Sequence, residues 1–170
     1  MRGVVADRSL FYDDVMIRKA TAQDSAAIGR MVAEFQDYLR GLGDRTEFDF
    51  GAGKYLRDGF GDDPAFEGLV AETESGVDGY LLYHFGYDTD TGRRLVHIID
   101  LYVREAARQR GIGSALMQRV AEIGRARGAE TMFWSVLETN VPARRFYEAL
   151  GARPVEGLRF MTLEIGAAGA

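Results

Sequence analysis

The chain of 170 residues contains no cysteine, only two histidines, three prolines and one tryptophan. Without cysteine it can form no disulfide, no thiolate metal site and no catalytic thiol. His84 and His97 are too few to favour a histidine-based metal centre. We therefore expect no metal and no covalent intermediate carried on sulfur.

Long apolar runs and an excess of positive charge are also lacking. No stretch approaches the roughly 20 apolar residues that a membrane-spanning helix needs, and no secretory apolar segment follows Met1. The formal net charge of −5 argues against a nucleic-acid partner. We expect a cytoplasmic protein without a membrane or nucleic-acid partner. Its composition predicts one domain over residues 13–165, a poorly ordered leader over 1–12 and a flexible tail over 166–170.

The most informative segment is the loop 108–113, Arg-Gln-Arg-Gly-Ile-Gly, between a predicted strand and a predicted helix. A strand that turns through glycines into a helix presents free backbone N–H groups and the positive end of the helix dipole. Such an arrangement binds phosphate or pyrophosphate. At Gly111 and Gly113 no Cβ hinders the approach of an anion. An ordinary strand-to-helix turn would look the same, so the loop alone does not decide.

A second motif covers residues 140–152, Asn-Val-Pro-Ala-Arg-Arg-Phe-Tyr-Glu-Ala-Leu-Gly-Ala. Asn140 can cap a helix whose first turn tolerates Pro142, and Gly151 can end it. The Arg-x-x-Gly-x-Gly loop followed by Asn-x-x-Ala-x-x-Phe-Tyr-x-x-Leu-Gly-Ala resembles, in order and spacing, two signatures of the GCN5-related N-acetyltransferase (GNAT) superfamily. Several further segments resemble its diamine (spermidine/spermine) and thialysine N-acetyltransferase branch. These segments are 17–24, 58–64, 69–72, 79–88 and 100–103.

The resemblance implies an α/β (α+β) GNAT fold, with a mixed, mostly antiparallel sheet of about six or seven strands and about four helices on its faces. Periodicity and turn signals place the elements. Strands are expected over 15–19, 66–72, 77–87, 95–103, 130–136, 153–157 and 159–165. Helices are expected between the Thr21 cap and Gly41, around Tyr55, and over 111–127 and 140–150.

The resemblance also implies acetyl-CoA as the donor co-substrate. The backbone amides of the loop and the first helical turn would take the pyrophosphate, aided by two arginines, and the strand at 101–103 would pair with the pantetheine arm. Asn140 would contact that arm, although a plain N-cap explains it equally well. The expected binding residues are Leu101, Tyr102, Val103, Arg108, Gln109, Arg110, Gly111, Ile112, Gly113, Ser114, Asn140, Ala143 and Phe146.

Two catalytic residues are expected. Tyr147 corresponds to the family's general acid, which protonates the leaving thiolate; a phenol with a reference pKa near 10 can do this, but a core tyrosine would also fit the pattern. The acceptor needs a base, because an alkylammonium group has a reference pKa near 10.4. Relatives carry a glutamate where this chain has Ile99. Asp100 remains and could act through water, although it points away from Ile99 unless the strand is bulged.

Other candidates carry less weight. Glu138 and His97 are weaker bases, and His97 fits better as a structural residue within the sheet. Tyr83, Phe85 and Tyr87 alternate on one strand face, which fits core or dimer packing, or an aromatic wall for an ammonium group.

The resemblance thus implies an N-acetyltransferase that moves an acetyl group to a primary amine of a small molecule, a diamine, polyamine or amino-acid-like compound, by direct attack in a ternary complex. A protein N-terminal or lysine acetyltransferase and an acetyl-CoA-binding module with little catalysis are the alternatives. The resemblance also implies a homodimer, because close relatives pair through their sheets and C-terminal strands. The identity of the amine and of the base stays open at this stage.

Overall fold

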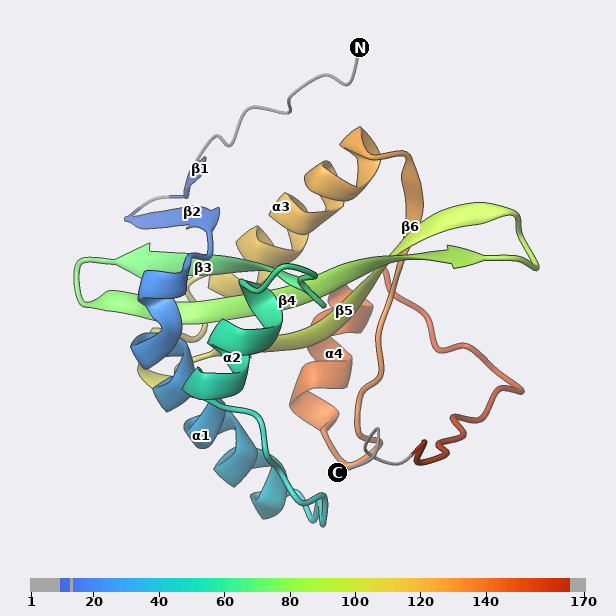
Figure 1. Cartoon of the computed structure of the whole chain (residues 1–170), viewed down its shortest axis with the longest axis horizontal. Coiled ribbons are helices and arrows are strands. Elements are labelled where there is room, and N and C mark those ends of the chain that lie inside the picture. Colours follow the sequence, from blue (N-terminus) through green and yellow to red (C-terminus); the bar gives the residue numbers. More distant parts are fainter. Residues whose placement is uncertain (1–9, 13, 166–170) are drawn as a thin grey trace.

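A six-stranded sheet with the spatial order β1-β2-β3-β4-β5-β6 forms the centre of the computed structural model, which describes residues 10–12 and 14–165 (Figure 1). Each neighbouring pair is antiparallel except β5 and β6, which run parallel. The strands are β1 (Leu10–Tyr12), β2 (Val15–Lys19), β3 (Glu67–Thr73), β4 (Gly76–Asp88), β5 (Arg93–Val103) and β6 (Ala129–Phe133).

Helices lie on both faces of this sheet (Figure 1). On one face, Ile28, Met31 and Tyr55 pack with Tyr80 and Leu82 of β4. On the other face, a second core joins α3 to the inner strands, and side chains of α4 pack against it. The helices are α1 (Ser25–Gly41), α2 (Ala52–Gly59), α3 (Ile112–Ala126) and α4 (Val141–Ala149).

The start of the first helical segment follows directly from its sequence. The backbone N–H of Thr21 donates to Asp24 Oδ2 at 2.8 Å, which forms the predicted capping box. Arg18 of β2 forms an ion pair with Asp24 at 2.7 Å. This contact lowers the pKa of Asp24 against the opposing effect of burial. The helix is therefore anchored to the strand that precedes it.

The expected mixed α/β layering and the helices are confirmed. The expected number of six or seven strands was slightly too high, because the strands expected at the C-terminus are not formed. The strand expected over 130–136 ends at Phe133, and the strands expected over 153–157 and 159–165 are not formed. Side chains of this last segment are largely exposed, with Met161 at 90% and Ile165 at 95%. Alternating apolar residues predict a strand, but a strand also needs a sheet edge to pair with, and this segment pairs with none within the described part of the chain.

The N-terminal boundary also differs from the expectation. Residues 10–12, expected within the leader, form β1 and pair with β2. Residues 1–9, 13 and 166–170 lie outside the described residues. Most of the expected leader and the whole expected tail belong to these residues.

Candidate active site

A bulge in β5 arranges the side chains at the centre of the site. Leu82 pairs with Asp100 and Tyr83 pairs with Ile98, so Ile99 is the extra residue. Ile98 and Leu101 both pack on the α3 side, although three positions separate them. Ile99 and Asp100 lie between these two residues along the strand. The carboxylate of Asp100 contacts Tyr80, which belongs to the core on the opposite face of the sheet.

Beyond the bulge, the chain builds the predicted anion loop. Gly111 caps α3 with a left-handed φ of 77°, and Gln109 has a φ of 62°, which is uncommon for a residue with a side chain. The free backbone N–H groups of the first turn of α3 therefore lie at this loop, together with the positive end of the helix dipole. Gly113 serves a different purpose, because a Cβ there would lie 3.2 Å from the ring of Phe146.

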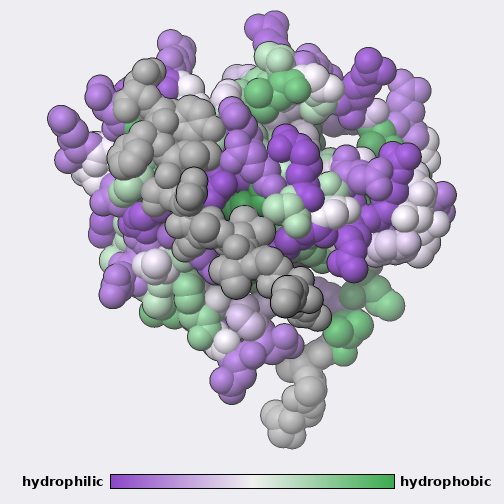
Figure 2. Space-filling model, turned by 90° about the horizontal axis from the view of Figure 1, so that it is seen from above, coloured by the Kyte–Doolittle hydropathy of each residue, from purple (hydrophilic) through white to green (hydrophobic). Residues whose placement is uncertain are grey.

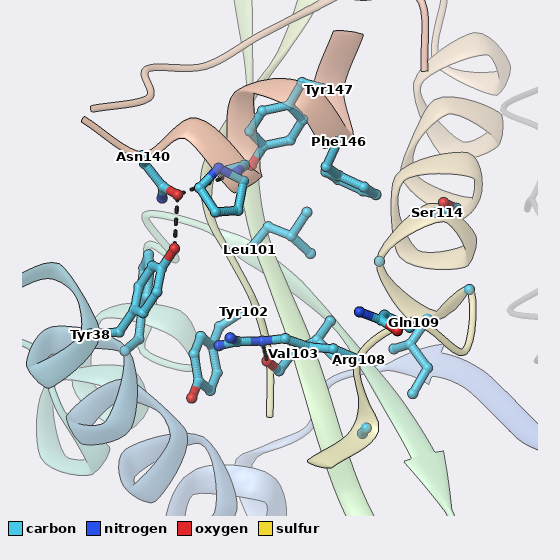
Figure 3. A pocket seen from close by; sticks show the side chains of 17 residues that line it. Tyr38, Leu101, Tyr102, Val103, Arg108, Gln109, Ser114, Asn140, Phe146 and Tyr147 are labelled. Carbon is cyan, nitrogen blue, oxygen red and sulfur yellow. Dashed lines mark hydrogen bonds between the residues drawn. The ribbon is translucent and has the colours of Figure 1, made fainter. Parts of the chain in front are cut away.

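A cavity of about 510 Å³ runs from this loop to Tyr147, between β5, α3, α4 and the end of α1 (Figure 3). Of the fifteen residues predicted for the site, all but Arg110 and Asp100 line it. The cavity also has walls that the sequence did not indicate, from Phe35 and Tyr38 of α1, Ala107 and Pro142. The lining residues are Phe35, Tyr38, Leu101, Tyr102, Val103, Ala107, Arg108, Gln109, Gly111, Ile112, Gly113, Ser114, Asn140, Pro142, Ala143, Phe146 and Tyr147.

Asn140 joins two helices at the cavity wall. Its Oδ1 accepts a hydrogen bond from the backbone N–H of Ala143 at 3.2 Å, so the predicted N-cap is confirmed. The same oxygen accepts the hydroxyl of Tyr38 at 2.8 Å (Figure 3). Both contacts use Oδ1, so the Nδ2 amide group keeps its donors for a ligand. The capping role and a binding role are therefore compatible.

Arg108 lies across the cavity beside the strand that would hold the pantetheine arm (Figure 3). Its guanidinium stacks on the rings of Tyr38 and Tyr102, at 5.3 and 5.6 Å from their centroids. Its Nε donates to the carbonyl oxygen of Val103 at 3.0 Å. A ligand that paired with this strand would compete for that carbonyl, and the exposed arginine is free to turn toward the anion loop.

Tyr147 lies at the inner end of the cavity, on the α3 side of the sheet (Figure 3). Its ring packs on Trp134 at 4.9 Å and on Phe146 at 5.1 Å between centroids. Burial, with the negative charge of Asp100 as a second cause, raises the pKa of Tyr147 to about 12. The phenol is therefore protonated at neutral pH, as a proton donor must be. Trp134 therefore packs against the candidate acid.

Asp100 lies just outside the cavity lining. Burial raises its pKa to about 6, against the opposing effect of a hydrogen bond of 2.9 Å that the Tyr80 hydroxyl donates. The other carboxylate considered, Glu138, is exposed, and its backbone carbonyl accepts from Arg144.

The aromatic residues of β4 divide between core and surface. Tyr83 is buried and Phe85 packs against the α3-side core, while Tyr87 is 62% exposed. Arg127 stacks over the ring of Phe85 at 4.6 Å. Packing therefore accounts for Tyr83 and Phe85, and neither belongs to the cavity beside Tyr147.

Among residues 10–12 and 14–165, no three potential metal ligands gather into a cluster. The helices of this described part are all too short or too polar to cross a membrane.

Three comparisons identify the family. Residues 30–152 match the family model described as the acetyltransferase (GNAT) family. The thialysine N-epsilon-acetyltransferase of Bos taurus is 38% identical over 148 residues, which cover 82% of this chain and 84% of the relative. The spermidine/spermine N(1)-acetyltransferase-like protein 1 of Homo sapiens is 32% identical over 85% of this chain, although only over 21% of its own length.

The fold comparison agrees. An integron cassette protein from the mobile metagenome of V. cholerae superposes with a TM-score of 0.74 at 23% identity, covering 89% of this chain and 93% of that one. With the signature motifs placed around one cavity, the chain belongs to the GNAT family and is an acyl-CoA-dependent N-acetyltransferase.

Proposed function

We propose that the protein transfers the acetyl group of acetyl-CoA to a primary amine of a small molecule, a diamine, polyamine or amino-acid-like compound, by direct attack in a ternary complex. The observation that carries this proposal is the single cavity that links the anion loop at the start of α3 to Tyr147. The similarity to thialysine acetyltransferases over most of both chains supports a small amine as the acceptor.

The donor fits the cavity by its chemistry. The amides of Gly111, Gly113 and Ser114 would receive the pyrophosphate, and the exposed Arg108 and Arg110 would add positive charge at the mouth. The remaining apolar lining and a volume of about 510 Å³ suit a pantetheine arm.

That arm would meet polar groups at two positions. The backbone of β5 at residues 101–103 would pair with it as an added strand, once Arg108 leaves the Val103 carbonyl. Asn140 would donate to it through Nδ2, and Ala143 and Phe146 would flank it.

The chemistry then needs a proton for the leaving sulfur. Tyr147 would give it, and two observations support this role: it is protonated at neutral pH and lies at the end of the cavity opposite the anion loop. Asp100 contributes a negative charge close to that phenol, and it is the carboxylate that the sequence suggests as a proton acceptor through water.

A homodimer forms part of the proposal. Six large apolar side chains at the C-terminal end are more than half exposed, and the surface shows separate hydrophobic groups among hydrophilic ones (Figure 2). A second copy of the chain is a suitable cover for such a segment, since an extended apolar segment readily pairs with a sheet edge. These side chains are Val155, Leu158, Phe160, Met161, Leu163 and Ile165.

The test follows thiol release from acetyl-CoA with a panel of acceptors: spermidine, putrescine, thialysine, lysine, amino sugars and short peptides. We expect turnover with a small amine, and a strong loss in Tyr147→Phe. Turnover with peptides alone would instead identify a protein acetyltransferase. Binding of acetyl-CoA, seen as a rise in melting temperature, with no turnover of any acceptor would contradict the proposal and indicate a binding module.

A further inference from the structure

The two histidines of the chain face each other across neighbouring strands. His84 of β4 and His97 of β5 form a register pair. His97 Nδ1 and His84 Nε2 are 2.8 Å apart, and the rings meet nearly edge to face with centroids 4.8 Å apart. Such a short contact between two ring nitrogens requires that one carries a hydrogen and the other a lone pair.

The backbone decides which nitrogen carries the hydrogen. His84 Nδ1 lies 3.2 Å from the carbonyl oxygen of Phe85, and a carbonyl can only accept, so Nδ1 of His84 is the protonated nitrogen. In a neutral ring, His84 Nε2 is then the acceptor, and the hydrogen between the rings belongs to His97 Nδ1. This leaves a lone pair on His97 Nε2. The chain of contacts thus fixes the tautomer in which His97 can accept a proton.

His97 also lies where β5 and β6 separate. His97 and Phe133 are the last register pair of the parallel ladder, and their rings lie 5.7 Å apart. The next residue, Trp134, packs on Tyr147. Val96 and Ile98 point to the α3 side, so His97 points to the opposite face. His97 and Tyr147 therefore lie on opposite faces of the sheet, and Phe133 and Trp134, the two residues at the end of β6, contact one of them each.

The surroundings of His97 favour its neutral form. Burial, and after it the nearby ring of His84, lowers the pKa of His97. His84 is the titratable group that lowers the pKa of His97 through its charge, and the neighbouring ring of Phe133 is uncharged. The side chain two positions along the strand, Ile99, offers no competing carboxylate. At neutral pH the imidazole is unprotonated and ready to accept a proton.

We propose that His97 is the general base for the acceptor amine and that His84 is a positioning residue that holds it in the accepting tautomer. This inference rests on the proposed function. The lone pair of the amine nitrogen forms the bond to the thioester carbonyl carbon, and a proton of that nitrogen passes to His97 Nε2. The C–S bond breaks with its electron pair on sulfur, which takes a proton from Tyr147. His97 then returns its proton to water, and Tyr147 regains one from water.

The first experiment measures kcat and KM for both substrates in His97→Gln and His97→Ala, using the acceptor found to be active with the wild type. We expect kcat to fall by about 10²–10⁴-fold, with the KM for acetyl-CoA changed by less than about threefold. Added imidazole should restore part of the activity of His97→Ala and none of that of His97→Gln, which leaves no space for it. A structural histidine would show no such rescue.

The second experiment separates positioning from packing. His84→Gln offers an amide oxygen that can still accept from His97 Nδ1, whereas His84→Phe does not. We expect His84→Phe to lose more activity than His84→Gln. In the pH profile of kcat/KM, the inflection on the acidic side should also shift in His84→Phe. Tyr87→Phe, an exposed site on the same strand, is the matched control.

The outcomes separate this inference from the function on which it rests. Wild-type turnover with full activity in both His97 variants would overturn the inference and leave the proposed function standing. The acidic inflection of the kcat/KM–pH profile could instead be lost in Asp100→Asn and retained in His97→Gln. That result would assign the base to Asp100 and would also overturn the inference. A wild type inactive with every amine would overturn both.

Discussion

Tyr38 at the end of α1 donates a hydrogen bond of 2.8 Å to Oδ1 of Asn140, the residue that caps α4. These residues stand 102 positions apart in the chain, yet one oxygen serves the helix cap and the link between the helices. The contact joins two walls of the cavity and leaves the Nδ2 group of Asn140 without a role in either hydrogen bond. The shape of the donor site therefore depends on α1 as well as on the signature motifs.

The Tyr38→Phe variant tests this link. Loss of the hydroxyl removes one hydrogen bond while Asn140 keeps its cap, so the free energy of unfolding should fall by about 0.5–1.5 kcal/mol. The KM for acetyl-CoA should rise several-fold, because Asn140 loses its second restraint. Urea unfolding and steady-state kinetics measure the two effects, with the exposed Tyr87→Phe as control. Equal stability and an equal KM in both variants would show that the link has no energetic role.

Tyr147→Phe tests the general acid. The ring keeps its packing on Trp134, so the fold and the KM for acetyl-CoA should change little, while kcat falls by about 10²–10⁴-fold. An acid is active while protonated, and the pKa of Tyr147 is raised to about 12. The wild type should therefore show no descending limb from this group between pH 7 and pH 10. A kcat within twofold of the wild type would leave Tyr147 as a packing residue.

The motifs of the sequence located most of the cavity because each of them is local. A glycine loop before a helix, and an asparagine cap before a Phe-Tyr pair, are determined by neighbours within a few positions. For the same reason the sequence placed α1, α3 and α4 within a few residues of their bounds. The wall formed by Phe35 and Tyr38 was missed, because on a helical wheel these residues read simply as a continuation of the apolar core stripe of α1.

Two other features depend on partners that are distant in sequence. The bulge at Ile99 was raised only as a possibility, since it arises from the register between β4 and β5. The pairing of His84 with His97 depends on that same register, and periodicity alone shows only two histidines on neighbouring strands. The prediction of two C-terminal strands was wrong for a similar reason. Alternating apolar residues indicate a segment suited to strand pairing, but they do not show whether a sheet edge is available to it.

The C-terminal segment provides the test of the proposed dimer. The wild type should scatter light as about twice the 18.8 kDa chain. A charge at Leu158 or Met161, both more than 70% exposed, should shift the protein toward the monomer, because a buried unpaired carboxylate opposes association. Leu158→Asp and Met161→Asp are compared with Glu156→Asp, which keeps the charge of its position. A monomeric wild type at micromolar concentration would contradict the dimer.

Gly113→Ala tests the close approach between α3 and α4. The new Cβ would lie 3.2 Å from the ring of Phe146, so that ring, which lines the cavity, must move slightly. We expect weaker acetyl-CoA binding, measured by calorimetry, with only a small loss of stability. Gly53→Ala in α2 is the matched control, because its Cβ would meet nothing within 4 Å. The control should gain about 0.5–1 kcal/mol from the better helix propensity of alanine.

Asp100→Asn tests the cost of a buried carboxylate through the pH dependence of stability. The pKa of Asp100 rises from 3.8 to about 6 on folding, so the folded state holds its proton more tightly than the unfolded state. The wild type therefore loses stability as the pH rises from about 4 to about 6, and the full penalty applies above that window. An asparagine can still accept from the Tyr80 hydroxyl and carries no charge.

The variant should thus be more stable than the wild type at pH 7.5, by up to about 3 kcal/mol at 1.36 kcal/mol per pKa unit. The difference should vanish near pH 4, where both side chains are neutral. Urea unfolding between pH 4 and pH 8 measures it, with Glu138→Gln as the exposed control. A constant difference across this range would mean that the carboxylate is not disfavoured by burial. A variant that is both stabilised and slow in acetyl transfer would show that the carboxylate is retained for function at a cost in stability.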